Sequence, residues 1–218
     1  MSASSSIALV FGAGQNVGAG VVKAFSAKGY RIATVSRTAT EDASDKRLHI
    51  QADLEDPESV SRVFATVRKQ LGHPSVVVYN GAAATFVNKA DPFELSLKDA
   101  IRDMNINTFS ALAAAKEAVK SFEALPKDAA RTFIFTGNIT NTQPIPALMS
   151  QGMGKSATAH MIQTAAFYYA DERKADGAAV YSAIDGEAHG QFYVELSEKD
   201  QGPWLATFVK GTGYMDFS

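Results

Sequence analysis

An apolar run that breaks into a glycine-rich turn and continues as a helix is the feature that most constrains this chain. Residues 8–18 read Ala-Leu-Val-Phe-Gly-Ala-Gly-Gln-Asn-Val-Gly, and apolar residues continue at helical spacing with Val21, Val22 and Phe25. Glycines let the backbone approach a pyrophosphate closely, and the free N–H groups and dipole at a helix start favour negative charge. The segment therefore predicts a site for nucleotide phosphates, although a glycine turn can also serve chain geometry alone.

The composition excludes several classes of protein. The chain has 218 residues, of which 46% are hydrophobic and 20% charged, with a net charge of −2 and no cysteine. This length holds a sizeable core, and no apolar run approaches the ~18 residues of a membrane span. Without cysteine there is no disulfide, thiolate zinc site or cysteine nucleophile, and the four scattered histidines predict no metal site. The weak charge argues against nucleic acid or membrane as partner, and the absence of a secretory signal leads us to expect a cytoplasmic protein.

Strand-like and helix-like segments alternate along almost the whole chain. The expected strands are residues 7–11, 31–36, 48–52, 75–79, 132–136, 178–184 and 205–209, and the expected helices are 17–28, 58–71, 97–123, 149–174 and 187–199. This alternation predicts an α/β fold, a Rossmann-type doubly wound parallel sheet of about seven strands with helices on both faces. No repeat or linker divides the chain, so we expect residues 1–218 to form a single dinucleotide-binding domain.

Further motifs make the chain resemble the short-chain dehydrogenase/reductase family over nearly its full length. They are an acid after the third strand, a small-residue element after the fourth, a helical asparagine, a lysine in the expected helix 149–174 and a glycine after the sixth strand. The resemblance implies a nicotinamide dinucleotide cofactor and hydride transfer to or from a small-molecule carbonyl or alcohol. The residues implied to bind the cofactor are Gly12, Gly14, Gln15, Asn16, Val17, Gly18, Ser36, Arg37, Asp53, Leu54, Asn80, Gly81, Ala82, Lys155 and Gly186.

Two positions at the cofactor edge depart from the family pattern. Asn16 stands where the second glycine is usual, and because asparagine is the commonest non-glycine residue in left-handed backbone, we expect it to preserve the turn. Arg37 follows Ser36 at the end of the second strand, where an acid would bind the ribose hydroxyl of NAD and an arginine suits a 2′-phosphate. The chain is therefore expected to use NADP(H); the alternative is that Arg37 is a solvated loop charge.

The catalytic positions depart further. When Lys155 is placed on the family lysine, Gln151 falls at the tyrosine position and Asn138 at the serine position. In the family the tyrosine hydroxyl passes a proton to or from the substrate oxygen, and a helical asparagine, matched here by Asn105, holds a water in the proton relay. Gln151 has no titratable proton, although both amides can donate hydrogen bonds to a carbonyl or oxyanion. The candidate catalytic residues are Lys155, Asn105, Asn138 and Gln151.

Some alternatives remain open at this stage. Thr136 or Thr140 replaces the serine if the register is shifted by two residues, and His189 or Tyr193 is a candidate replacement acid, although a histidine at a helix start is more often a surface residue. An oxidoreductase with a non-standard site competes with a non-catalytic dinucleotide-binding sensor and with a lyase or isomerase that uses the amides as an oxyanion site. The family commonly pairs its two long helices across a two-fold axis, so we expect a homodimer or homotetramer.

Overall fold

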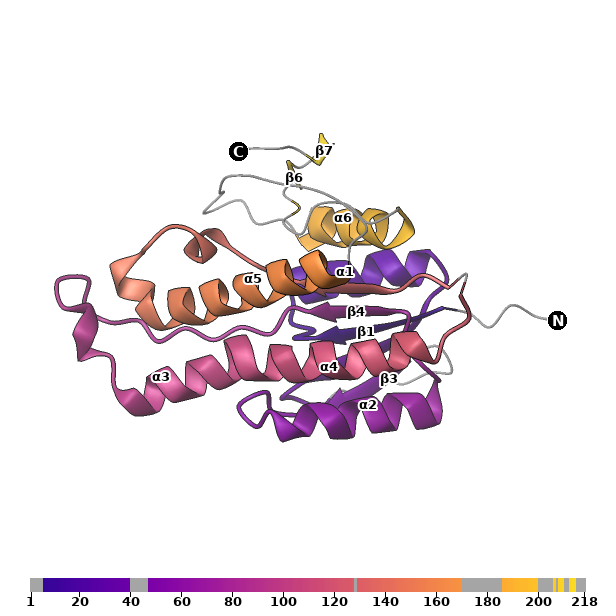
Figure 1. Cartoon of the computed structure of the whole chain (residues 1–218), viewed down its shortest axis with the longest axis horizontal. Helices are drawn as coiled ribbons and strands as arrows, with labels where there is room; N and C mark the ends of the chain where they lie inside the picture. The colour runs from indigo at the N-terminus through magenta and orange to yellow at the C-terminus, as the bar shows by residue number, and fades with distance from the viewer. Residues whose placement is uncertain are drawn as a thin grey trace.

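The core of the fold is a five-stranded parallel sheet (Figure 1). The computed structural model describes residues 6–39, 47–127, 129–169, 186–199, 206, 208–209 and 212–214. The strands are β1 (Ile7–Phe11), β2 (Arg31–Ser36), β3 (Arg47–Gln51), β4 (Val76–Tyr79) and β5 (Thr132–Phe135), in the order β3-β2-β1-β4-β5. The order reverses between β1 and β4, and the crevice outside the carboxyl ends of the strands at such a reversal is where open α/β sheets bind ligands.

Helices cover both faces of this sheet and bury its central strands completely. α1 (Val17–Ala27) and α6 (Gly186–Glu198) lie on one face, and α2 (Glu58–Gln70), α4 (Ser110–Glu123) and α5 (Met149–Tyr169) contribute to the core on the other (Figure 1). Along β1 the side chains alternate, so that Leu9 and Phe11 join one core while Ala8 and Val10 join the other. The two cores explain why this strand is apolar at every position.

Helices α1 and α6 pack backbone against backbone. A Cβ atom added to Gly20 of α1 would lie 1.8 Å from the carbonyl oxygen of Gly186, and one added to Gly190 would lie 2.2 Å from that of Gly20. No side chain larger than hydrogen fits at this contact. The start of α6 is thereby held directly against the glycine turn that precedes α1.

The expected long helix at 97–123 contains an irregular turn. Its first part is α3 (Leu97–Met104), a π-helical turn follows at Asn105–Phe109, and α4 completes it. The hydroxyl of Tyr79, at the end of β4, donates to the carbonyl oxygen of Ile106 in this turn at 2.6 Å. The other expected helices and the first five strands agree with the structure to within one or two residues where they are described.

One strand was placed wrongly by the sequence analysis. Residues 178–184 and 170–174 lie outside the described residues, but the end of the strand expected at 205–209 is described as β6 (Phe208–Val209). It pairs antiparallel with β7 (Gly213–Tyr214) in a separate two-stranded sheet. Only three residues separate β6 from β7, a length that suits a hairpin and cannot make a parallel crossover. Within the described chain, no helix is long and apolar enough to cross a membrane.

Candidate active site

The glycine turn after β1 has the shape of a phosphate cradle. Gly12 has a φ of +74°, and a Cβ there would lie 2.7 Å from the backbone nitrogen of Gly81. On the outer side, no atom lies within 4 Å of a Cβ placed on Gly14, and Gln15 and Asn16 are exposed. The turn is therefore tightly packed at Gly12, against the chain that follows β4, and open at Gly14. It lies at the amino end of α1, and this arrangement admits a pyrophosphate.

Asn16 does not use the left-handed conformation that we expected. Its φ is −101° and its ψ is −102°, and the positive φ of the turn belongs to Gly12. The backbone of Gly186 packs against Asn16, since a Cβ on Gly186 would fall 2.5 Å from the Asn16 carbonyl oxygen. Contact with α6, rather than an intrinsic preference of asparagine, holds the chain here.

Most of the other predicted cofactor residues lie at the carboxyl ends of β2, β3 and β4, at the same edge as the turn, whereas Lys155 lies on α5 and Gly186 at the start of α6. The Asn80 amide donates to the carbonyl oxygen of Gly12 at 2.8 Å. Arg37 is exposed, and no described side chain pairs with its guanidinium. Asp53 is exposed, and its side chain accepts a hydrogen bond from the backbone nitrogen of Glu55 at 3.0 Å. This contact lies within the turn, and it is a structural role that needs no cofactor.

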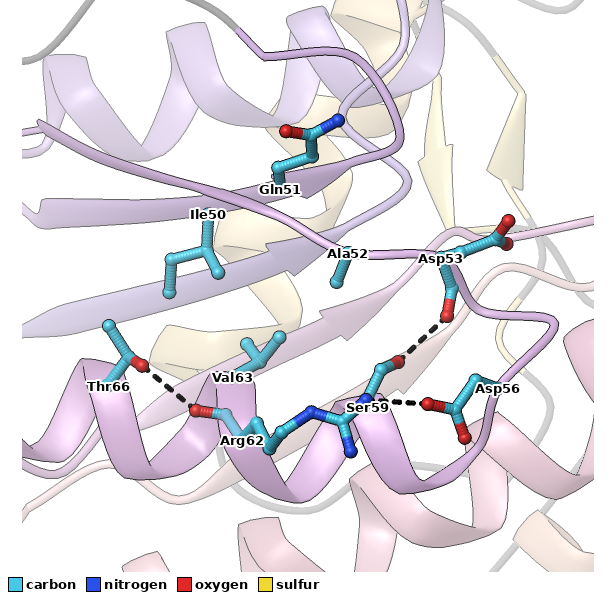
Figure 2. Close-up of a pocket in the computed structure, with 9 residues that line it drawn as sticks. All are labelled: Ile50, Gln51, Ala52, Asp53, Asp56, Ser59, Arg62, Val63 and Thr66. Atoms are coloured by element: carbon cyan, nitrogen blue, oxygen red, sulfur yellow. Dashed lines mark hydrogen bonds and ion pairs between the residues drawn. The ribbon is translucent and has the colours of Figure 1, made fainter.

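A hollow of about 360 Å³ lies beside this edge, between the end of β3 and α2 (Figure 2). Asp53 is at one end of it, and Arg62 donates to Asp56 across its wall at 2.6 Å. The hydrogen bond from Arg62 lowers the pKa of the Asp56 carboxyl. Neither the glycine turn nor Lys155 lines this hollow, so it adjoins the predicted dinucleotide site without containing the catalytic candidates.

Lys155 is a buried cation on α5. Only 2% of it is exposed, its Nζ donates to the carbonyl oxygen of Thr136 at 2.7 Å, and it lies 4.4 Å from the centre of the Phe135 ring. Burial lowers the pKa of the Lys155 ammonium to about 7. Both protonation states are therefore populated at neutral pH, which an exposed helix lysine does not achieve.

The side chains of Asn138 and Gln151 are in direct contact. The Asn138 Nδ2 donates to the Gln151 Oε1 at 2.9 Å, and the Asn138 Oδ1 accepts from the backbone nitrogen and the hydroxyl of Thr140 at 3.0 and 2.5 Å. Thr140 is buried, and the Thr136 hydroxyl is bonded to that of Tyr193 at 2.8 Å. Both threonine hydroxyls, which were alternatives for the serine, have internal partners.

Asn105 is not part of this cluster, which corrects the sequence analysis. Its amide donates to the carbonyl oxygen of Glu55 at 3.1 Å. Asn107, two residues on, is fully buried and makes a pair of hydrogen bonds with the backbone of Ala83, at 2.8 and 3.1 Å. It packs against Gly154, where an added Cβ would fall 2.5 Å from the Asn107 Cβ. The structure therefore puts Asn107, rather than Asn105, next to the helix turn that carries Lys155.

A buried polar cluster fixes the first turn of α5. Asp103 is fully buried and accepts hydrogen bonds from the Ser150 hydroxyl at 2.6 Å, the Thr85 backbone nitrogen at 2.7 Å and the Arg102 guanidinium at 2.7 Å. Burial alone would raise the pKa of Asp103, but the hydrogen bonds outweigh it and hold the pKa below its usual value. Sequence reasoning missed this cluster, which positions the residue next to Gln151.

The two candidate replacement acids lie on α6. The His189 ring meets that of Tyr193 edge-on with centres 5.9 Å apart. Tyr193 is buried, and burial raises the pKa of its hydroxyl to about 12. A hydroxyl that is this weakly acidic and already bonded to Thr136 is a poor proton donor at neutral pH. Among the described residues, no group of three or more histidine, aspartate or glutamate side chains could hold a metal ion.

Comparison with known proteins gives consistent matches. A family model described as short chain dehydrogenase matches residues 6–187. The chain is 50% identical to the short chain dehydrogenase/reductase dmxR12 of Cryptosporiopsis sp., in an alignment that covers 98% of this chain and 96% of the relative. Two solved structures share the fold: a short-chain dehydrogenase/reductase from Serratia marcescens (TM-score 0.72, 22% identity, 88% of each chain) and the NADPH-dependent 3-quinuclidinone reductase from Rhodotorula rubra (TM-score 0.72, 17% identity, 88% of this chain and 84% of that one).

The burial of Lys155 predicts a pH dependence of stability. Its pKa in the folded protein, about 7, lies below its ordinary value of 10.5, so between these values the unfolded chain binds the proton more tightly. The free energy of unfolding should therefore fall by roughly 3 kcal/mol as the pH drops from about 9.5 to about 7, and Lys155→Met should abolish this fall. Urea unfolding at both pH values measures it, with Lys69→Met, at an exposed site on α2, as control. If the free energy of unfolding falls by the same amount between these pH values in the wild type and in Lys155→Met, the prediction is contradicted.

Proposed function

Because the chain belongs to the short-chain dehydrogenase/reductase family, we propose that it is an NADP(H)-dependent oxidoreductase acting on a carbonyl or alcohol of a small molecule, with a non-standard catalytic site. The observation that carries the proposal is that the open glycine turn and the buried Lys155 lie at the carboxyl edge of one sheet. When bound, the cofactor supplies or accepts the hydride. The chain's own residues bind and orient the cofactor and the substrate, and they donate or accept the proton.

The residues at this edge fit a dinucleotide. The backbone N–H groups of the turn and the start of α1 would hold the pyrophosphate, in the space left open above Gly14. Arg37 would bind a 2′-phosphate, because it is exposed and has no competing partner in the described structure. Asp53 and the segment 80–82 would contact the adenosine. The Rhodotorula rubra reductase, which has the same fold, is NADPH-dependent, and this supports NADP(H) for the present chain.

The side-chain amides of Asn138 and Gln151 determine which hydrogen bonds the site can make with the substrate oxygen. Asn138 and Gln151 stand where the family has serine and tyrosine, and both retain N–H groups that would donate to a carbonyl oxygen or oxyanion. Neither can release a proton. Lys155, one helical turn after Gln151, is the titratable group on this helix whose pKa of about 7 suits acid–base work at neutral pH. We infer that the proton comes from Lys155 or from solvent.

The apolar surface of α3, α4 and α5 supports the homodimer or homotetramer. Large hydrophobic side chains are exposed along these helices, among them Leu97 (76%), Ile101 (53%), Leu112 (42%) and Met153 (48%). Burying such a stripe against a second copy removes apolar surface from water.

Cofactor preference should depend on Arg37. Arg37→Asp should weaken NADPH binding by about 1.5–3 kcal/mol, because it removes a charge-assisted contact with the 2′-phosphate, and should leave NADH binding much less affected. Isothermal titration of both dinucleotides measures this. Lys69→Asp makes the same charge change near the carboxyl end of α2 and serves as control. Equal affinity of the unmodified protein for NADH and NADPH would contradict the choice of NADP(H).

The rate of carbonyl reduction should depend on the side chains at positions 138 and 151. Without a general acid the native protein should reduce ordinary ketones poorly, since such an acid contributes a factor of about 10² to 10⁴. Gln151→Tyr combined with Asn138→Ser should raise this rate, measured by the loss of NADPH absorbance over a panel of ketones. If the protein binds NADPH but neither form transfers hydride, the non-catalytic sensor is the better assignment. High native turnover that His189→Ala abolishes would move the acid to α6.

The proposed assembly predicts the mass of the protein in solution. Light scattering at micromolar concentration should give a dimeric or tetrameric mass, and the pair of changes Leu97→Lys and Ile101→Lys should shift it towards the monomer, because two charges would be buried at the interface. Ala65→Lys adds a charge to the exposed face of α2 and should leave the mass unchanged. A monomeric mass for the unmodified protein would contradict the proposal.

A further inference from the structure

The hydrogen bonds around Asn138 and Gln151 fix which atom of each amide faces which way. The backbone N–H of Thr140 can only donate, so the Asn138 atom that it meets at 3.0 Å must be Oδ1. The Asn138 nitrogen is then the atom that faces Gln151, and because an amide nitrogen can only donate, the Gln151 atom 2.9 Å away must be Oε1. One backbone N–H therefore sets the orientation of both side chains.

The outer face of this pair presents donors. Two N–H bonds of the Gln151 Nε2 and the second N–H bond of the Asn138 Nδ2 have no acceptor in the part of the chain that the structure describes. Asn138 is exposed and Gln151 half-buried, so these groups reach the surface. The amide oxygens, by contrast, already accept hydrogen bonds within the cluster.

The loop that carries Asn138 is held in place before any ligand arrives. The Ser156 hydroxyl of α5 lies 3.3 Å from the carbonyl oxygen of Thr140 and 3.1 Å from that of Asn141. The Asn141 side chain accepts from the Asn138 backbone nitrogen at 3.3 Å. Donors that are fixed in this way need no reorganisation to stabilise a negative charge.

Among the described residues, the charged groups that contact the elements around this pair would not repel an anion there. Lys155, on the next turn of α5, is buried with its Nζ on Thr136. Asp103 of α3, which holds Ser150, is itself buried, and its charge is met by Arg102. On α6, Tyr193 is bonded to the Thr136 hydroxyl and stays neutral at physiological pH, and its ring packs against that of His189.

We propose that the Asn138–Gln151 pair is an oxyanion site, and that the substrate is a small molecule with an acidic ring hydroxyl or enol conjugated to its carbonyl. Hydrogen bonds to a charged oxygen are roughly twice as strong as those to a neutral one, so a donor-only face favours a phenolate or enolate. The same amides cannot give a proton to a strongly basic alkoxide, so they suit oxygens that are stable as anions. That this ligand is the substrate rests on the proposed function; the anion preference of the site does not.

The test uses 4-nitrophenol, whose phenolate absorbs visible light and which ionises near neutral pH. Binding to the protein should favour the phenolate, shift the titration of bound 4-nitrophenol to lower pH, and exceed the binding of 4-nitroanisole, which cannot ionise. The titration is run without cofactor and with oxidised dinucleotide, so that no turnover contributes to the signal.

Three variants test whether the phenolate binds at the Asn138–Gln151 pair. Gln151→Leu should weaken phenolate binding about tenfold, because it removes the outward N–H groups at similar volume. Gln163→Leu, at an exposed position three turns further along α5, should change nothing. Asn138→Asp should turn the Gln151 nitrogen inward toward the new carboxylate, expose its oxygen and reverse the preference, so that the neutral phenol binds better than the phenolate. Circular dichroism confirms that each variant is folded.

Equal affinity for 4-nitrophenol and 4-nitroanisole, no detectable phenolate binding, or phenolate binding that Gln151→Leu leaves unchanged would overturn the oxyanion site. Dinucleotide binding is measured separately by isothermal titration. If the protein binds neither NADPH nor NADH but phenolate binding still depends on Gln151, the oxidoreductase assignment fails and the oxyanion site stands.

Discussion

The contact between Gly12 and the chain that follows β4 is the constraint on which the whole carboxyl edge depends. It brings the ends of the two central strands together closely enough that a single Cβ would collide with the backbone, and the Asn80 amide closes the contact with a hydrogen bond to Gly12. Because the strand order reverses between these two strands, the same contact sets the floor of the predicted dinucleotide site. The positions of the glycine turn, of segment 80–82 and of the start of α1 all follow from it.

Hydrogen bonds of buried polar groups connect the sheet to the elements that hold the catalytic candidates. Tyr79 reaches from β4 to the π-helical turn, Asn107 joins that turn to Ala83, and Asp103 joins α3 to Thr85 and to the start of α5. Each of these groups is fully buried, and leaving one of its partners unpaired would cost about 1–3 kcal/mol. The loop after β4 therefore acts as the common support for both helices of the site.

The sheet and its helices could be predicted from the sequence because the spacing of the hydrophobic residues matches the positions that are buried in the structure. β1 and β4 are apolar at every position since both faces are covered, and the amphipathic period of α2 marks its buried side. The register of Lys155 with Gln151 and Asn138 came from the resemblance to the family, whose lysine, tyrosine and serine spacing was placed on this sequence. What fails is local geometry set by distant contacts: Asn16 takes its conformation from α6, and the π-helical turn separates the surroundings of Asn105 and Asn107. A signal for Asn107 did exist, because it continues the inward row of Asp103, Ala111, Ala114 and Ala118.

The glycine contact between α1 and α6 makes these two helices a single mechanical unit. The backbone of Gly186 rests against Asn16, and that of Gly190 against Gly20, with no side chain between them to absorb a displacement. Neither helix can therefore approach the other more closely at this contact, and the position of the glycine turn is tied directly to that of α6. Since α6 also carries Tyr193, which is bonded to Thr136 beside Lys155, a continuous series of direct contacts joins the glycine turn to the surroundings of the lysine.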